Sequence, residues 1–163
     1  MSTPATTSSS GFSLSPPDPE ERKRLEADLS REETEVLLHH GTEAPFCGGL
    51  LDQKDSGVYC CRLCALPLFQ HKTKFESNTG WPSFWAPIDE AHVTAIKDSS
   101  YGMMRIETLC ARCGSHQGHV FPDGPPPTRL RYCINSISLE FVAAGGTLRD
   151  PLGRGDTDHL VTA

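Results

Sequence analysis

Four cysteines in two C-x-x-C pairs could together bind one metal ion. Cys61 and Cys64 form the first pair, and Cys110 and Cys113 form the second. A C-x-x-C turn directs both sulfurs to one point, so two turns complete the tetrahedral thiolate shell of a structural zinc ion. The 45 residues between the pairs exceed the spacing of a simple zinc ribbon. We predict a structural Zn²⁺ that joins distant parts of the chain and has no open position for catalysis.

Two redox pairs, or unrelated buried cysteines, are the alternatives to zinc. A redox C-x-x-C pair usually opens a helix in an α/β setting. Pro67 follows Cys64 by three residues and opposes a helix there. The spacing therefore favours the metal.

Cys133 lies outside both pairs, in a strand-like run, and is a candidate nucleophile. An isolated cysteine in an apolar strand is commonly an inert core residue. Here Arg131 and Asn135 share its face by the two-residue period of a strand. A guanidinium beside a thiol lowers the pKa of the thiol and favours the thiolate. We therefore predict that Cys133 is reactive.

Two histidines and an aromatic segment could complete a site around this cysteine. His116 and His119 directly follow the second cysteine pair, and histidine supplies an acid near neutral pH. They could instead be zinc ligands or surface residues, but four cysteines already fill a zinc shell. Trp81 and Phe84, in a predicted loop, could form an apolar wall for a small methyl-like group or simply fill the core.

Short strands must position these groups. Strand-like runs at residues 93–96, 103–108, 130–133 and 137–142 are separated by glycine, proline, asparagine and aspartate, with a loop at residues 122–129. Asp18 with Pro19, and Ser30 with Glu33, resemble helix starts, the second helix running to Gly41. We predict a mainly β, barrel-like antiparallel domain that binds zinc and has short N-terminal helices. Residues 1–17 are expected to be a disordered tail, residues 18–145 the domain, and residues 146–163 a loose tail.

Composition narrows the classes of partner. The 163 residues carry a net charge of −6 and no basic patch, so nucleic acid is not expected. No apolar run approaches a membrane span, and the N-terminus lacks the features of a secretory signal. Seven cysteines are an odd number, which favours metal binding or catalysis over a disulfide framework. We expect a cytoplasmic monomer.

Several motifs in order resemble the methionine-R-sulfoxide reductase family. The resemblance runs from residue 44 to about residue 142 and rests on VYCCRLCALPLF, KFESNTGWPSF, SYGMMRIETLCARCGSHQGHVFPDGP and LRYCINSISLEF. It implies a zinc-bound antiparallel β fold. It also implies that Cys133 is the nucleophile, that His116 and His119 bind and protonate the sulfoxide oxygen, that Trp81 contacts the substrate methyl group, and that Arg131 and Asn135 support the thiolate.

The expected reaction forms a sulfenic acid on Cys133, then a disulfide with a second thiol, which thioredoxin reduces. The substrate would be methionine-R-sulfoxide in proteins or peptides, or the free amino acid. Many relatives have a resolving cysteine where this chain has Thr79, and a hydroxyl cannot form a disulfide. Cys47, before two glycines, is the predicted resolving thiol, and direct reduction by an external thiol is the alternative. Cys60 adjoins Cys61 and is expected to be packed.

Two further departures bear on substrate or partner preference. Gln117 replaces a commonly apolar residue, and Arg129 replaces a common glycine. A zinc-stabilised binding module, or a β domain that only recognises ligands at Trp81, are the competing classes. The binding module would leave the face of Arg131, Cys133 and Asn135 and the paired histidines unexplained.

Overall fold

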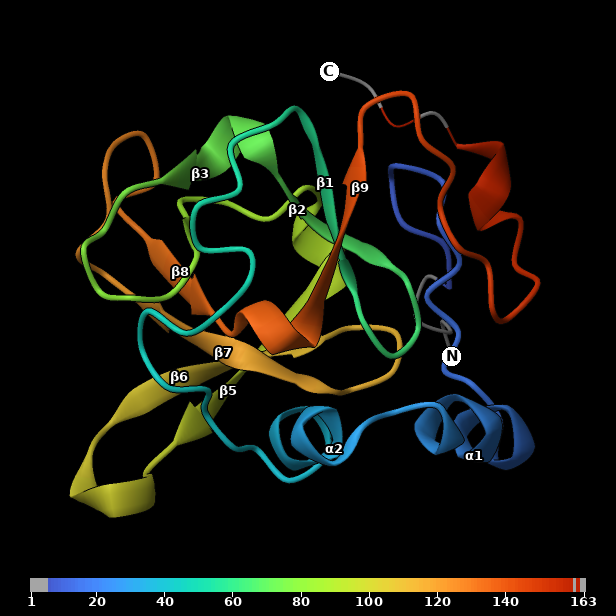
Figure 1. Ribbon diagram of the computed structural model, residues 1–163, viewed down its shortest axis with the longest axis horizontal. Helices are drawn as coiled ribbons and strands as arrows, with labels where there is room; N and C mark the ends of the chain where they lie inside the picture. Colours follow the sequence, from blue (N-terminus) through green and yellow to red (C-terminus); the bar gives the residue numbers. More distant parts are fainter. Residues whose placement is uncertain (1–5, 160, 162–163) are drawn as a thin grey trace, which may run out of the picture.

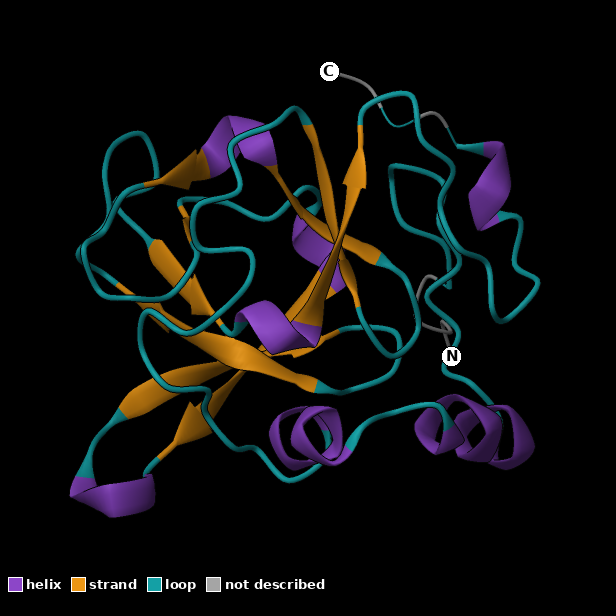
Figure 2. Ribbon diagram, viewed as in Figure 1, coloured by secondary structure: helices purple, strands orange, loops and turns teal. Residues whose placement is uncertain are grey.

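The computed structural model describes residues 6–159 and 161, and it is mainly β with two short helices (Figures 1 and 2). The helices are α1 (Pro19–Ala27) and α2 (Arg31–Leu37). The strands are β1 (Gly57–Cys61), β2 (Pro67–Gln70), β3 (Lys74–Phe75), β4 (Ser83–Phe84), β5 (Val93–Asp98), β6 (Arg105–Cys110), β7 (His116–Phe121), β8 (Arg131–Ile134) and β9 (Leu139–Ala143). Every pairing between these strands is antiparallel, so the predicted fold class is confirmed.

Both helices begin at reciprocal capping boxes. The side chains of Asp18 and Ser30 accept the backbone N–H of Glu21 and Glu33, whose carboxylates accept the N–H of the two capping residues. Both helix starts were predicted from the sequence, but α2 ends at Leu37 rather than at the predicted Gly41. In the described part of the chain, no helix is long and apolar enough to cross a membrane.

The strands form two sheets. A three-stranded sheet has the order β2-β1-β9, and a six-stranded sheet has the order β3-β4-β8-β7-β6-β5. In the larger sheet β8 lies between β4 and β7, so residues on β8 are flanked on both sides. Figure 1 shows α2 beside β7, with the β5–β6 hairpin projecting from the body of the protein. Cys133, which is on β8, therefore lies near the centre of this sheet with a neighbouring strand on each side.

The four predicted runs are close to observed strands, and two of them, 103–108 and 137–142, begin two residues before the strand that each one matches. Residues 136–138 form a 3₁₀ turn, and β9 starts at Leu139. The backbone N–H of Asn135 donates to the Gln117 carbonyl of β7 at 2.9 Å, and its side chain bonds the backbone of Glu43 and Gln117, directly before the chain turns. Strand β7, which carries both histidines, was not among the predicted runs because His116–Phe121 is buried over four residues and lacks an apolar alternation.

Segments at both ends of the chain pack against the domain, unlike the predicted tails. Phe12 is buried, and the Ser8 hydroxyl lies 2.9 Å from His92 Nε2. At the other end Leu148 and Leu152 belong to the hydrophobic core. Apolar side chains at these positions supply the burial that a loose tail would lack. Residues 1–5, part of the predicted disordered tail, lie outside the described residues, and the domain limits 18–145 stay a prediction.

Candidate functional site

The four cysteines of the two C-x-x-C pairs lie together and could hold a metal ion. Their sulfurs all lie within 4.8 Å of one another, and all four residues are buried. Cys61 Sγ is 3.6 Å from Cys113 Sγ, and Cys64 Sγ is 3.5 Å from Cys110 Sγ. Four sulfurs placed about 2.3 Å from a central zinc ion are about 3.8 Å apart at the tetrahedral angle. The separations and the all-sulfur donor set fit a structural zinc ion.

Polar neighbours of these cysteines fit thiolates rather than an apolar core. The Ser115 hydroxyl lies 3.2 Å from Cys61 Sγ and 3.1 Å from Cys113 Sγ. The Gln117 side-chain amide, fully buried, lies 3.5 Å from Cys61 Sγ, a distance at which it can donate to sulfur. Gln117, one of the departures from the family pattern, therefore contacts the metal site. Such hydrogen bonds to ligating sulfurs orient the ligands and stabilise their charge.

Cys133 and His119 are direct neighbours across two strands. They are paired residues of β8 and β7, so their side chains project from the same face of the sheet. A cavity of about 100 Å³ opens at this face. Its lining comprises Thr42, Trp81, Arg105, Gly118, His119, Phe121, Cys133 and Asn135. The structure thus brings together four of the predicted residues, and it adds Thr42, Arg105 and Phe121, which the sequence did not single out.

The electrostatics around Cys133 differ from the sequence expectation. Burial raises the pKa of the Cys133 thiol above its ordinary value, against the lowering effects of Thr79 and Arg131. Thr79 Oγ1 lies 3.9 Å from Cys133 Sγ. Arg131 shares its charge with Asp123, through Nε at 2.8 Å and Nη2 at 3.1 Å. Because this carboxylate neutralises part of the guanidinium charge, Arg131 alone does not lower the net pKa of the thiol.

Each predicted acid histidine has a carboxylate partner. His116 Nδ1 lies 2.5 Å from Glu107 Oε2, and His119 Nε2 lies 2.8 Å from Asp98 Oδ2. Hydrogen bonds from Ser100 and His119 hold the pKa of Asp98 well below its ordinary value, so it stays ionised. Burial lowers the pKa of His116, although Glu107 opposes this effect, so the ring is a stronger acid when protonated. Glu107 is a buried carboxylate on β6, and its signal in the sequence is an acidic residue within the strand-like run 103–108.

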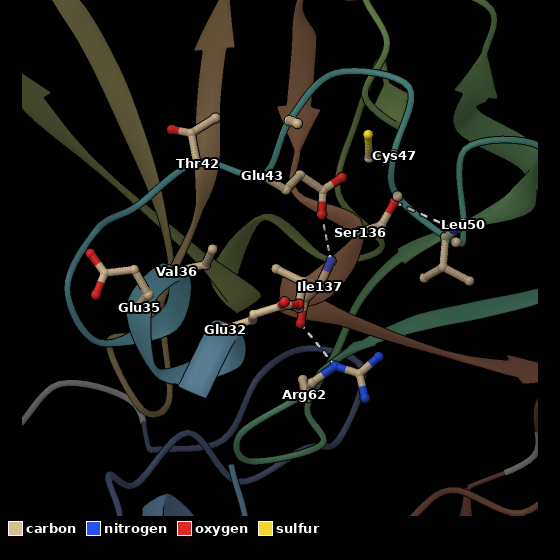
Figure 3. Close-up of a pocket in the computed structure, with 13 residues that line it drawn as sticks. Glu32, Glu35, Val36, Thr42, Glu43, Cys47, Leu50, Arg62, Ser136 and Ile137 are labelled. Atoms are coloured by element: carbon tan, nitrogen blue, oxygen red, sulfur yellow. Dashed lines mark hydrogen bonds between the residues drawn. The ribbon is translucent and has the colours of Figure 1, made fainter. Parts of the chain in front are cut away.

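Asn135 and Trp81 are held by one residue, Glu43. The Glu43 N–H donates to Asn135 Oδ1 at 3.0 Å, and its carbonyl accepts Trp81 Nε1–H at 3.0 Å. Its carboxylate accepts the N–H of Ile137 at 2.8 Å, as Figure 3 shows. The Asn135 side chain also donates to the Gln117 carbonyl at 3.0 Å. Glu43 therefore fixes two walls of the cavity, and no local sequence pattern identified it.

Phe84 does not occupy the predicted position at the substrate. It is fully buried, and its ring stacks on Phe69 with centroids 4.5 Å apart. On β4 it pairs with Tyr132, so it points into the hydrophobic core while Ser83 faces Cys133. The alternation of side chains along a strand thus makes Phe84 a core residue.

The two remaining cysteines have opposite environments. Cys60 is buried on β1, and burial raises the pKa of its thiol far above the ordinary value. Cys47 is exposed and lines a second cavity of about 670 Å³ between α2, the loop after it and the turn at Ser136 (Figure 3). Thr42 lines both cavities. Of the two, only Cys47 is accessible to another thiol.

The Cys47 loop contacts the loop that carries Thr79. The N–H of Phe46 donates to the Gly80 carbonyl at 2.7 Å. Gly80 has a φ of +91°, and a Cβ there would lie 2.7 Å from Pro45. A glycine thus permits both the turn and the close approach of the two loops. The loop that carries Cys47 is therefore bonded to Gly80, the residue that follows Thr79, whose side chain lies beside Cys133.

Comparison with known proteins gives consistent matches over most of the chain. Residues 29–143 match the SelR domain. A peptide methionine sulfoxide reductase MsrB of Caulobacter vibrioides is 70% identical over 156 residues, 96% of this chain and 98% of that protein. Proteins of the same name from Xylella fastidiosa and Escherichia coli are 57% and 52% identical, over 89% and 73% of this chain and 94% and 87% of their own lengths.

Proposed function

The chain belongs to the SelR-domain family and is an oxidoreductase of the peptide methionine sulfoxide reductase type, and we propose that it reduces methionine-R-sulfoxide through Cys133. The observation that carries this proposal is the pairing of Cys133 with His119 at one cavity. A sulfur nucleophile and a proton donor facing the same small space are what oxygen transfer from a sulfoxide requires.

The chemistry transfers one oxygen and two electrons. The Cys133 thiolate attacks the sulfoxide sulfur while a histidine, His119 or His116, protonates the oxygen. The S–O bond of the substrate and the new bond between the two sulfurs then break, and the oxygen ends on Cys133 as a sulfenic acid. The substrate sulfur gains the two electrons that the cysteine sulfur loses, and methionine leaves. Trp81, held at the cavity by Glu43, offers an apolar surface to the methyl group.

Recycling needs a second thiol, and Cys47 is the proposed source. Its thiolate attacks the Cys133 sulfur, a disulfide forms, and the oxygen leaves as water after protonation. Support comes from the exposure of Cys47, the burial of Cys60 and the contact between the Cys47 loop and Gly80. A dithiol protein such as thioredoxin then exchanges with the disulfide and restores both thiols.

A structural zinc ion, bound by Cys61, Cys64, Cys110 and Cys113, would stabilise the fold and take no part in the reaction. The turn that holds Cys113 leads directly into β7, where His116 and His119 lie. The metal ligands would therefore fix the start of the strand that presents the acid groups.

A thioredoxin-coupled assay on both sulfoxide epimers tests the reaction. We expect NADPH-dependent turnover with methionine-R-sulfoxide, little turnover with the S epimer, and none in Cys133→Ser. Comparison of the free amino acid with a peptide substrate in the same assay decides the substrate class. Equal rates on both epimers, or activity that survives Cys133→Ser, would overturn the proposal and favour a binding module.

The resolving step can be tested separately, because Thr79 lies beside Cys133 and can be replaced by a cysteine. Cys47→Ser should lose thioredoxin-dependent turnover but still form one methionine per chain in a single turnover. Adding Thr79→Cys to this variant should restore recycling, because it places a thiol beside the sulfenic acid. Normal recycling by Cys47→Ser alone would show that an external thiol resolves Cys133.

We also propose that the protein is a cytoplasmic monomer. None of its seven cysteines forms a disulfide, and thiols persist in reducing compartments, which supports the cytoplasmic location. Sedimentation analysis of the reduced protein and localisation of a tagged chain in its host test these two points. A stable dimer or a periplasmic signal would contradict them.

A further inference from the structure

His40, Glu107 and His116 form a compact cluster outside the four-cysteine site. Glu107 lies on β6 and His116 on β7, while His40 follows α2. Nδ1 of both histidines points at the same oxygen, Glu107 Oε2. All three ligand atoms lie within 4.8 Å of one another. His40 has a φ of +58°, an uncommon backbone conformation for a residue other than glycine that holds the ring at this position.

We propose that these three residues are a second metal site, which binds a divalent transition metal such as Zn²⁺, and that its occupation inhibits the reductase. Two imidazoles and a carboxylate are a common three-residue donor set for zinc, with a fourth position open to water. The same set also binds Co²⁺ and Ni²⁺, with affinities that generally rise along the series from Mn²⁺ to Cu²⁺. The metal-binding half of the proposal is independent of the reaction, whereas the inhibition rests on the proposed function.

The donors need only a small rearrangement to accept a metal. Donor atoms about 2.1 Å from a zinc ion are about 3.4 Å apart at the tetrahedral angle. His116 Nδ1 is 2.5 Å from Glu107 Oε2, so the donors must separate by about 1 Å to admit the ion. Each neutral ring would move its single proton from Nδ1 to Nε2 and bind through Nδ1, so the neutral rings release no proton. His116 Nε2 has no hydrogen-bond partner among the described residues, which leaves it free to hold that proton.

Burial divides the cluster into a fixed part and an accessible part. The side chains of His116 and Glu107 are 2% and 8% exposed, whereas that of His40 is 54% exposed. Two neighbouring strands therefore hold two ligands, and the exposed third ligand can move to close the site around an ion arriving from solvent. A metal on His116 would prevent that ring from donating a proton and would restrict the movement of His119, whose ring centroid lies 5.6 Å from that of His116. This effect would reduce the rate of the chemical step without any metal reaching Cys133.

Metal binding is tested by calorimetric titration of Zn²⁺ into the full chain, with one structural zinc already bound. Cys47→Ser and Cys133→Ser are introduced for this titration, so that no accessible thiol competes for the ion. We expect one additional zinc per chain, and an affinity at least about tenfold weaker after His40→Gln. His39→Gln is the matched control, because His39 is exposed, adjacent and outside the cluster. No additional zinc, or equal binding in both histidine variants, would overturn the site.

Inhibition is tested by single turnovers of the reduced chain with its native thiols, in the absence of chelating dithiols. We expect Zn²⁺ to slow methionine formation at least about fivefold in the unmodified and His39→Gln chains at concentrations that fill the site, and much less in His40→Gln. His40→Gln itself should turn over at the normal rate without Zn²⁺. Equal inhibition of His40→Gln would overturn the regulatory role, while absence of any turnover would instead indicate that the proposed function fails.

Discussion

Loss of the Asp156 carboxylate should destabilise the protein severely, although this residue lies in the C-terminal segment. Asp156 Oδ2 is 2.9 Å from Arg112 Nη2, and the two side chains are 1% and 0% exposed. Arg112 also donates to the Cys64 carbonyl at 2.7 Å and the Ser13 carbonyl at 3.2 Å. It therefore connects the metal-binding cysteines to both ends of the chain. Asp156→Ala leaves a buried guanidinium without its counter-charge, which costs about 3–5 kcal/mol.

Thermal unfolding of the full chain measures this cost. At about 2–4 °C per kcal/mol for a chain of this size, the melting temperature should fall by roughly 6–20 °C. Asp158→Ala, an exposed carboxylate in the same turn, is the matched control and should change little. Adding Arg112→Met to Asp156→Ala should recover part of the loss, because it removes the unpaired charge. A change below about 1 kcal/mol in Asp156→Ala would refute the reasoning.

Three further predictions concern the metal, the nucleophile and the cavity walls. Cys110→Ser should abolish zinc binding, measured by metal content, and unfold the domain, measured by circular dichroism; a folded, zinc-loaded and active variant would contradict the metal assignment. Burial raises the pKa of Cys133, so its alkylation rate in the reduced chain should still be rising at pH 9.0, and Asp123→Asn should shift this profile to lower pH because it frees the charge of Arg131. A profile that levels off near pH 7 would contradict this assignment. Glu43→Ala should lower kcat/KM, by removing the acceptor of Ile137 N–H at a local cost of about 1–3 kcal/mol, whereas Glu43→Gln should retain most activity.

Local chemistry made the helix starts and the cysteine cluster predictable from sequence. A capping box depends on residues three positions apart, and a C-x-x-C turn brings two sulfurs together within four residues. The start of β9 was predicted less accurately because it depends on side-chain contacts with distant backbone groups. Asn135, for example, bonds Glu43 and Gln117, and the chain forms a 3₁₀ turn directly after it.

Residues of the candidate site that are close together in the sequence could be predicted from it, whereas those that meet across the fold could not. Cys133, Arg131 and Asn135 follow a two-residue period, but Glu43, Asp98 and Glu107 reach the site from other segments. Phe84 was misplaced because an aromatic cluster does not reveal which side chain faces the core. A lower pKa was expected for Cys133, but burial and the Asp123 carboxylate raise it. Neither effect is visible in the local sequence pattern.

One departure from the family pattern has a conformational consequence. Arg129 has a φ of +61°, a conformation that glycine adopts without steric cost. It lies on an exposed loop, where its N–H donates to the Pro125 carbonyl at 2.9 Å. The chain therefore accepts backbone strain at this position, and nothing in the structure explains what the arginine side chain contributes.

Oxygen transfer to Cys133 is the central claim, and a single turnover of Cys47→Ser tests it most directly. The reduced variant is mixed with one equivalent of methionine-R-sulfoxide and a sulfenic-acid trap, and the products are analysed by mass spectrometry. The account predicts one methionine per chain and the trapped adduct on Cys133 alone. Methionine formed without modification of Cys133, or an adduct on another cysteine, would contradict it.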